Sequence, residues 1–442
     1  MPRWLSPSKQ KVLKALLKGS VFLPYHAASE TLSSLSQNSK FRFGAAYSSK
    51  PLLSTAVVDC VNAIKTQLGP GRHPHFCQLL VTAEAHGTHI EYAPLECLSS
   101  KEAAAPVVIG GAVQGLLANE SSNVAGVSLF AAHMPGVEFM PFHVKSTSLP
   151  ELTAAQWDSL LQSSMSSQDN HCNVAAVLLS EPHFTQVDEL ISRIQGVLPS
   201  TPLVGGVTQP NAWGVNPWGG QRSLRGAVFL NQRTYDEGAV GCFMQGRLKM
   251  DAMCDQGCRP VGEAATVTSS HRGTIMQLDH QTALLVVRQM FQSLSDKDRE
   301  LQIQIGLNTA GNGNSFVTRS ISSFNPHDQT VQVAVSDVPE GSVVQLHVRD
   351  PQWAQNNILK QLRGYVARLP EGIKSNPQQL GSLSYSCGTL AHEEERMLHE
   401  AVPKSPFQGA QFQGEFGPAS GGLQTKSFLH SYSSTFGLIR PV

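Results

Sequence analysis

The chain has 442 residues, which predicts two or three domains of ordinary size. Hydrophobic residues make up 41% of it and charged residues only 15%, which suits packed globular cores and argues against a coiled coil, charge-rich disorder or a broad phosphate-binding surface. The net charge is zero and no apolar run approaches the roughly 18 residues of a membrane helix, so we expect neither a nucleic-acid partner nor a membrane span.

Residues 1–42 differ from the rest of the chain in charge. They carry seven Lys and Arg residues against one acid, so their net charge is +6 and that of the remaining 400 residues is −6. Apolar side chains between Leu5 and Leu17 recur at helical spacing. A basic, Ser-rich, amphipathic start is typical of a transit peptide and indicates import into a chloroplast or mitochondrion. The alternative is the N-terminal arm of a cytoplasmic protein.

Alternating strands and helices are predicted from about residue 43 onward. Short apolar runs at 76–82, 107–109, 124–131, 137–144 and 174–179 indicate strands. The segment 187–194 has apolar residues at i, i+3, i+4 and i+7, which predicts a surface helix with one buried stripe.

An internal similarity links two of these segments. Residues 106–115 and 202–210 each carry a short strand with a Gly-Gly pair, Gly110-Gly111 and Gly205-Gly206, and Gln114 follows the first pair. Glycine permits a close approach of the backbone to a ligand or to a neighbouring strand. These residues are therefore candidates for ligand contact, with packing between strands as the alternative.

The second half combines a connection with alternating strands. Residues 246–273 contain Gly246, Gly257, Pro260 and Gly262 and are predicted to be a connecting stretch. A helix is predicted over 279–294, and polar–apolar alternation at 301–307, 331–335 and 343–348 predicts half-buried strands. We expect an α+β fold of two sandwich-like halves, with mixed or antiparallel sheets covered by helices. The expected divisions are a leader (1–42), one domain (43–245) and a second domain (246–442).

Common cofactor and catalytic motifs are absent from the sequence. It has no phosphate loop, no dinucleotide fingerprint, no His-Glu-x-x-His and no Gly-x-Ser-x-Gly. Cys254 and Cys258 lack the second close ligand pair of a zinc site. Eight cysteines are too few for a disulfide scaffold and are interpreted as free thiols. We expect no cofactor and no metal.

Candidate ligand-binding side chains gather in the second half. Arg349 and Asp350 end a predicted strand, and as a pair they suit the carboxylate and ammonium groups of an amino acid. The alternative is structural, because Asp350-Pro351 is also a good helix start. Cys387 follows another strand, Glu415 lies in a predicted rigid turn, and His430 follows it; an enzyme would use Cys387 as nucleophile with His430 or Glu415 as base.

Several ordered motifs resemble those of FIST-domain proteins, which have an N-terminal and a C-terminal FIST part. The resemblance covers roughly residues 43–442. It rests on the segments 256–262, 340–350, 414–418, 428–430 and 436–441.

The resemblance implies a non-catalytic sensory or signal-transduction module that binds a small ligand such as an amino acid. Some eukaryotic members carry an F-box and serve ubiquitin ligases as substrate receptors, which suggests a protein–protein adaptor as an alternative. Residues 1–42 lack the apolar helical density of an F-box. The family's arginine after the C-terminal cysteine is also missing in Cys387-Gly388-Thr389, which favours the adaptor.

Overall fold

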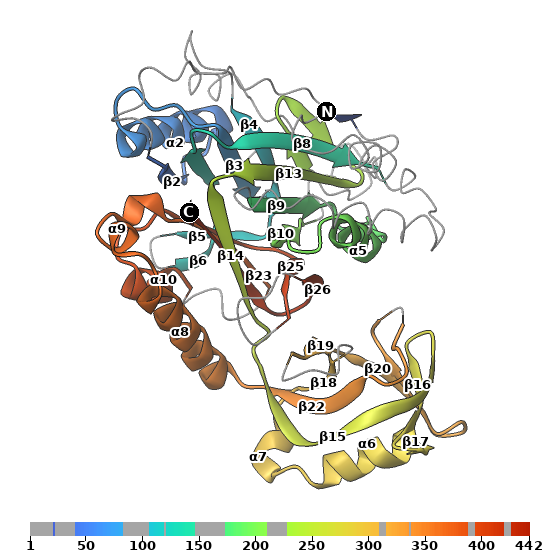
Figure 1. The fold of residues 1–442 in the computed structure, drawn as a ribbon. Helices are drawn as coiled ribbons and strands as arrows, with labels where there is room; N and C mark the ends of the chain where they lie inside the picture. The colour runs from blue at the N-terminus through green and yellow to red at the C-terminus, as the bar shows by residue number, and fades with distance from the viewer. Residues whose placement is uncertain are drawn as a thin grey trace.

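The computed structural model describes residues 21–22, 40–82, 106–118, 121–145, 173–209, 228–308, 315–335, 337–387, 394–419 and 426–442. Mixed and antiparallel sheets carry helices on their faces, which confirms the predicted α+β class (Figure 1). Of the predicted leader, only the backbone of β1 (Val21–Phe22) and residues 40–42 lie within these ranges, so organelle targeting stays a prediction.

Three units with the same strand order form the larger part of the molecule. The first comprises β2 (Arg42–Ser48), α2 (Leu53–Leu68), β3 (Phe76–Thr82), β4 (Val107–Val113) and β7 (Val127–His133). The second comprises β8 (Glu138–Val144), β9 (Asn173–Ser180), α5 (Val187–Val197), β10 (Leu203–Val207) and β13 (Ala239–Gly246). The third comprises β14 (Leu248–Asp255), α8 (Pro351–Ala367), β23 (Gly381–Ser386), α10 (Glu394–Ala401), β24 (Phe407–Gln411) and β27 (Ser434–Pro441), with α9 (Glu371–Lys374) and a 3-10 turn (Pro377–Gln379) before β23.

Strand pairing is equivalent in the three units. Their spatial orders are β2-β7-β3-β4, β8-β13-β9-β10 and β14-β27-β23-β24. In each, the last two strands are parallel and the other neighbours are antiparallel. The predicted similarity between 106–115 and 202–210 therefore reflects equivalent strands, although β4 and β10 lie in different sheets.

Each unit also has a hairpin that pairs with the edge strand of another unit's sheet. These hairpins are β5 (Gly115–Ala118) with β6 (Ser121–Val124), β11 (Val228–Leu230) with β12 (Arg233–Tyr235), and β25 (Gly414–Pro418) with β26 (Ser427–His430). β5 pairs with β24, β11 with β4, and β25 with β10, which closes a cycle. The sheets therefore cross the predicted domain boundary near residue 245.

Three glutamines mark the centre of this cycle. The backbone amides of Gln114, Gln209 and Gln413 donate to the carbonyls of Gln411, Ala112 and Val207 at 2.9–3.0 Å. Their side chains also bond to one another in sequence: Gln209 donates to Gln114 at 3.2 Å, and Gln413 donates to Gln209 at 3.1 Å. Equivalent contacts at equivalent positions indicate an approximate threefold axis here.

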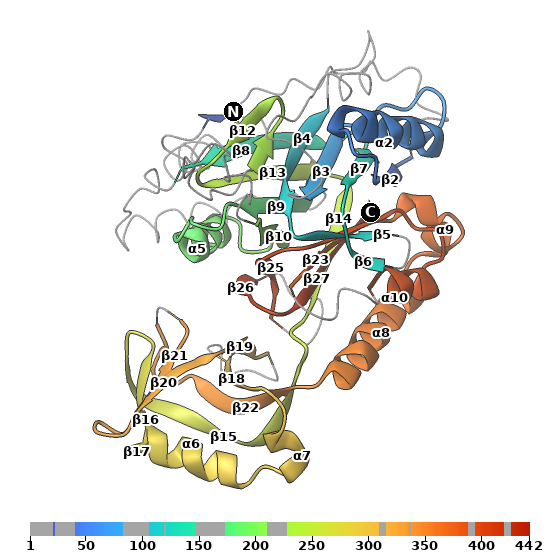
Figure 2. The same ribbon diagram turned by 180° about the vertical axis from the view of Figure 1, so that it is seen from behind.

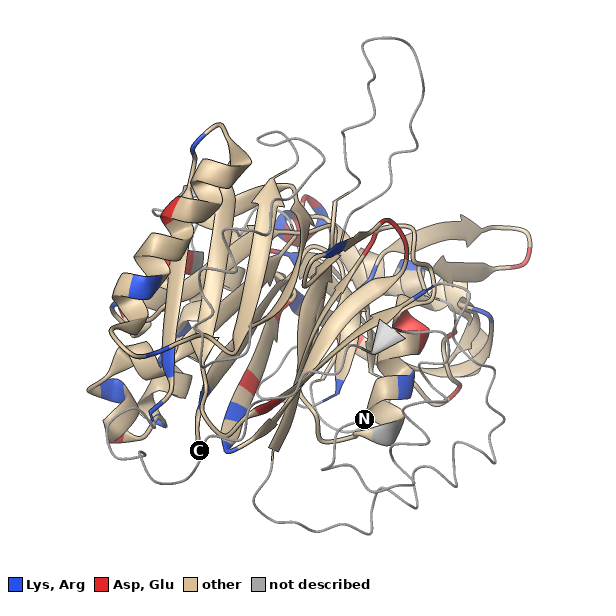
Figure 3. Cartoon of the chain, turned by 90° about the horizontal axis from the view of Figure 1, so that it is seen from above, with Lys and Arg blue, Asp and Glu red and all other residues tan. Residues whose placement is uncertain are grey.

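The remaining segment forms a separate lobe inserted into the third unit, between β14 and α8. It contains β15 (Cys258–His271), β16 (Thr274–Leu278), β17 (Gln281–Thr282), α6 (Ala283–Gln292), α7 (Asp296–Arg299), β18 (Ile303–Asn308), β19 (Val317–Arg319), β20 (Ile321–Asn325), β21 (Thr330–Val333) and β22 (Val343–Arg349). The lobe lies at the bottom of both ribbon views and has its own apolar core (Figures 1 and 2). Seen from above, Lys and Arg are sparse and scattered, as the low charge content predicts (Figure 3).

Two local predictions in the second half are wrong. The stretch 246–273 is not a connection but contains β14 and β15, and the predicted turn at 414–418 is strand β25. Gly262, with φ +66°, occupies a register shift between Val261 and Ala264, as a bulge requires. Pro260 is tolerated because β15 pairs only with β22 at this end.

A buried polar network joins the sheets of the first and third units. The Tyr385 hydroxyl donates to the Gln78 side chain at 2.7 Å, and the Gln78 amide donates to Gln408 at 3.1 Å. The Gln408 amide donates in turn to the Gln78 carbonyl and to Ser128. Such a network favours one relative placement of the two sheets, because any shift leaves buried polar groups unpaired.

The exposed edge of β2 is covered by one side chain from α2. The Gln67 side chain accepts from the Ala45 amide at 2.9 Å and donates to the Ala45 carbonyl at 2.8 Å. We expect Gln67→Leu to lower the free energy of unfolding by about 1–2 kcal/mol, because two hydrogen bonds are lost. Urea denaturation measures this change, with the exposed Asn62→Leu on the same helix as control. Equal stability of the two variants would contradict the assigned role.

Candidate functional site

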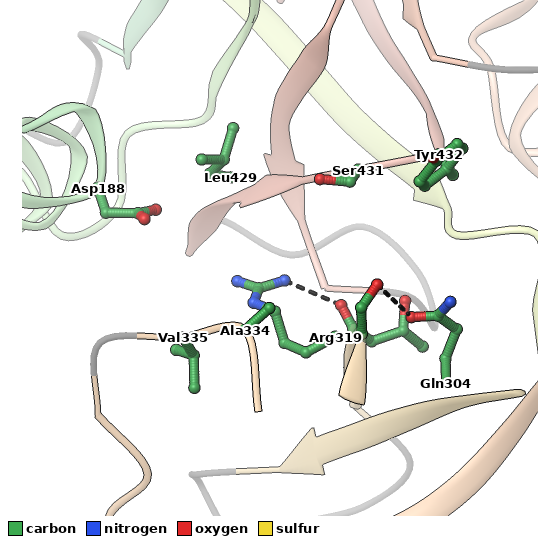
Figure 4. Close-up of a pocket in the computed structure, with 10 residues that line it drawn as sticks. Asp188, Gln304, Arg319, Ala334, Val335, Leu429, Ser431 and Tyr432 are labelled. Atoms are coloured by element: carbon green, nitrogen blue, oxygen red, sulfur yellow. Dashed lines mark hydrogen bonds between the residues drawn. The ribbon is translucent and has the colours of Figure 1, made fainter. Parts of the chain in front are cut away.

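A pocket of about 120 Å³ lies where the inserted lobe meets the second and third units. The lobe contributes residues of β18, β19 and the segment after β21, and the opposite wall comes from α5, β26 and the β26–β27 turn (Figure 4). The residues lining it are Asp188, Gln304, Thr318, Arg319, Ser320, Ala334, Val335, Leu429, Ser431 and Tyr432. The pocket is therefore built from three distant parts of the sequence.

Arg319 supplies the positive charge of the pocket. It ends the short strand β19 and donates through Nη1 to the Thr318 carbonyl at 3.0 Å. Burial lowers the pKa of Arg319, whereas Asp188 raises it. A guanidinium stays charged despite such a shift, so it presents free donors to a carboxylate.

Asp188 supplies the negative charge from the opposite wall. It lies in the first turn of α5, and its carboxylate and the Arg319 guanidinium face the same space (Figure 4). Loss of hydration raises the pKa of Asp188, while Arg319 and the Leu429 amide lower it. Within the described ranges the two groups form no direct ion pair with each other. The space between them suits a molecule that carries both charges.

Tyr432 lines the same pocket in a strained conformation. Its φ is +59°, which is unusual for an aromatic residue, and 48% of it is exposed. The predicted site residue Arg349 holds it there, because its Nη1 donates to the Tyr432 carbonyl at 3.0 Å and its guanidinium lies 4.8 Å from the ring centroid. Arg349 thus lies behind the pocket wall.

Asp350 has a structural role, because it caps helix α8 and binds Arg259. It is the N-cap of α8, where its side chain accepts from the Trp353 amide at 3.0 Å. Its other oxygen accepts from Arg259 at 3.0 Å, and Arg259 also binds Asp298. These contacts lower the pKa of Asp350, the helix amide having the largest effect. The geometry matches the structural alternative for Asp350, and Asp188 takes the acidic position in the pocket.

Gln114 belongs to the three-glutamine centre, and Cys387 and Glu415 lie near it. The Cys387 thiol is 3.5 Å from the Gln413 carbonyl, and the buried Glu415 accepts from the amide and hydroxyl of Ser433 at 2.6 and 2.9 Å. Burial and the Glu415 charge raise the pKa of Cys387, against smaller opposing effects of the Tyr432 backbone and Arg349. This environment does not favour a thiolate nucleophile.

The raised pKa makes a prediction for thiol labelling. At pH 7 we expect Cys387 to react with iodoacetamide about tenfold or more slowly than it does in the urea-unfolded chain, because only the thiolate reacts. The rate should still be rising above pH 9. Peptide-resolved mass spectrometry of labelled protein measures both. Labelling at pH 7 as fast as in the urea-unfolded chain, or faster, would instead support the cysteine-enzyme alternative.

His430 is fully buried beside this cluster. It pairs with Glu415 across β25 and β26, and its Nε2 lies 2.9 Å from the Gly417 carbonyl. Burial lowers its pKa to about 3, with Arg319 as a second cause. The ring is therefore neutral at physiological pH, and Nε2 donates to the carbonyl.

The predicted glycines contact protein atoms. A Cβ on Gly110 would lie 2.1 Å from the Leu79 carbonyl oxygen, and one on Gly205 would lie 1.7 Å from that of Leu178. A Cβ on Gly206 would lie 2.7 Å from the Phe412 ring. Gly111 is buried in the middle of β4. These contacts explain the glycines by packing, and none of the four lines the pocket.

The sequence analysis missed Arg319, Asp188 and Tyr432. Asp188 is one of two acids at the start of a surface helix, where acids are common. Arg319 lies in a three-residue edge strand, and Tyr432 lies in the turn after β26. No local motif marks them, since only the insertion of the lobe brings them together.

Comparison with known proteins identifies the family. The FIST N domain model matches residues 78–281 and the FIST C domain model matches residues 274–418. The chain therefore belongs to the FIST family, as the sequence motifs predict.

Two mycobacterial relatives are similar over much of the chain. Uncharacterized protein MT0656 of Mycobacterium tuberculosis (strain CDC 1551 / Oshkosh) is 26% identical over 422 residues, covering 90% of this chain and 99% of the relative. Uncharacterized protein Mb0898c of Mycobacterium bovis is 26% identical over 278 residues, covering 59% of this chain and 66% of the relative.

Three further observations concern metals, thiols and membranes. Within the described ranges, no three His, Cys, Asp or Glu side chains are grouped to hold a metal ion. The six described cysteines are free thiols. None of the described helices has both the length and the apolar character to cross a bilayer.

Proposed function

We propose that this protein is a sensory module that binds a small zwitterion, such as an amino acid, in the pocket between Arg319 and Asp188. FIST domains are generally sensory domains of signal transduction. The observation that carries the proposal is the pair of opposite charges on facing walls, each without a direct partner ion across the pocket. Arg319 would bind the carboxylate and Asp188 the ammonium group.

Pocket size favours a short side chain on the ligand. The pocket has a volume of about 120 Å³, smaller than the roughly 150 Å³ of a protein cavity that accommodates benzene. Ala334, Val335 and Leu429 provide apolar surface, and Ser431 and Gln304 provide polar atoms. The dimensions therefore suit glycine, alanine or serine better than an aromatic amino acid.

A thermal-shift panel of matched analogues tests the proposal. We expect alanine to raise the melting temperature of the full chain, since a ligand at 100 times its Kd adds about 2.7 kcal/mol of stability. Propionate and ethylamine each keep one charge and should produce a much smaller shift. Equal shifts with alanine and propionate, or none with any small amino acid, would refute zwitterion binding in this pocket.

The described geometry gives less support to the alternatives. The cysteine enzyme would need an activated thiol, and burial raises the pKa of Cys387. The adaptor reading, with a signalling or ubiquitin-ligase partner, stays a prediction, as does the predicted location in an organelle or the cytoplasm.

A further inference from the structure

The motif Gln256-Gly257-Cys258 lies where the chain enters the inserted lobe, and the pocket does not use it directly. The chain leaves the lobe at Arg349 and Asp350. The two crossings lie side by side, because Cys258 pairs with Arg349 and the Asp350 amide donates to the Gly257 carbonyl at 3.1 Å. Gly257 has φ +64°, a conformation that glycine adopts without strain. A pair of adjacent connections is the geometry of a hinge.

The lobe folds around an apolar core of its own. Its buried apolar cluster contains only residues between Val261 and Val348. The pocket is a place where the lobe meets the other units, with six lining residues from the lobe and four from the rest. A rotation about the hinge would therefore change the distance between Arg319 and Asp188.

Gln256 connects the hinge to the strand that carries Arg319. Its side-chain amide donates to the Phe316 carbonyl at 2.7 Å, and its oxygen accepts from the amide and hydroxyl of Thr318 at 2.6 and 3.0 Å. The Thr318 carbonyl in turn accepts from Arg319 at 3.0 Å. Gln256 is 2% exposed, so water does not replace these bonds readily. The position of Arg319 is thus tied to the hinge.

We propose that residues 255–258 and 349–350 form a ligand-controlled hinge, and that Gln256 is the positioning residue that couples the hinge to Arg319. This rests on the proposed function, since a zwitterion that bridges Arg319 and Asp188 binds the closed lobe better than the open one. Only such a difference in affinity allows a ligand to shift a conformational equilibrium. A signalling partner would then recognise the closed conformation of the lobe.

The hinge can be tested without a ligand by small-angle X-ray scattering of the full chain. Arg319→Glu places two negative charges across the pocket, and we expect a larger radius of gyration at low ionic strength, where the repulsion is least screened. Adding Asp188→Arg to this variant restores opposite charges and should restore the wild-type value. Arg288→Glu, on an exposed face of α6, makes the same charge change and should alter nothing. Identical scattering from wild type and Arg319→Glu would overturn the hinge.

The coupling role of Gln256 is tested with alanine as the probe. Gln256→Leu should weaken alanine binding about tenfold, because Phe316 and Thr318 lose their buried partner. Gln256→Glu keeps the acceptor for Thr318. Its affinity for alanine should therefore lie between that of Gln256→Leu and that of wild type. Gln408→Leu, which breaks a buried network far from the hinge, should lower stability but leave the affinity of the folded protein unchanged.

The outcomes separate this inference from the proposed function. Alanine could bind wild type without lowering the radius of gyration in small-angle X-ray scattering, or it could bind Gln256→Leu as tightly as wild type. Either result overturns the hinge inference and leaves ligand binding intact. If no small zwitterion binds wild type, the proposed function fails together with ligand control. The charge-reversal series still decides whether the lobe moves.

Discussion

Gly205→Ala should lower the free energy of unfolding by about 4 kcal/mol or more. The new Cβ would lie 1.7 Å from the Leu178 carbonyl oxygen, in the middle of the parallel pairing between β9 and β10. Gly205 also has φ +155°, which disfavours any side chain. Relief requires the two strands to separate, and this disturbs the centre of a sheet. Chemical denaturation followed by circular dichroism measures the loss.

Gly364→Ala is the matched control for this substitution. Gly364 lies within α8, and a Cβ there would meet no atom within 4 Å. Alanine in a helix interior is about 0.5–1 kcal/mol more favourable than glycine, so this variant should be slightly more stable than wild type. If Gly205→Ala were as stable as Gly364→Ala, packing would not explain the glycine, and the ligand-contact alternative would regain support.

Arg319→Met should reduce affinity for a small zwitterion about 100-fold. Methionine fills similar space but cannot donate to a carboxylate, and hydrogen bonds to charged groups contribute about 1.5–3 kcal/mol. The same variant should lose little stability, because relief of the desolvated Arg319 charge offsets the loss of its hydrogen bond to Thr318 and of its favourable effect on Asp188. Competition binding and thermal denaturation measure the two quantities on one sample. Arg288→Met, exposed on α6, serves as control; a loss of stability matching the loss of affinity would contradict the assignment.

Much of the secondary structure could be predicted from the sequence because its signals are local. Strands β3, β8 and β9 follow their apolar runs, β22 follows its polar–apolar alternation, and α5 follows its helical periodicity. The threefold arrangement was only partly visible. Two units carry a Gly-Gly pair, whereas the third has Gly409 followed by alanine.

The stretch 246–273 shows why glycine and proline mislead when they are taken alone. Gly262 and Pro260 are typical of a connection, yet one forms a bulge and the other lies where the strand has an unpaired edge. Strand pairing decides whether such residues are tolerated, and pairing is a property of the whole sheet.

The pocket could not be predicted from local patterns because its charges are far apart along the chain. Arg319 and Asp188 come together only through the inserted lobe, and Tyr432 joins them from a turn near the C-terminus. The sequence analysis expected an arginine and an acid at Arg349 and Asp350, whereas the proposed pocket has these charges at Arg319 and Asp188. Arg349 supports the pocket through Tyr432, and Asp350 caps α8.

Isothermal titration calorimetry of the full chain with alanine is the most direct test of ligand binding between the two charges. We expect a 1:1 binding isotherm with wild type that is lost in Arg319→Met and in Asp188→Asn, while both variants remain folded. The same isotherm in wild type and both variants would place the ligand elsewhere and contradict this site.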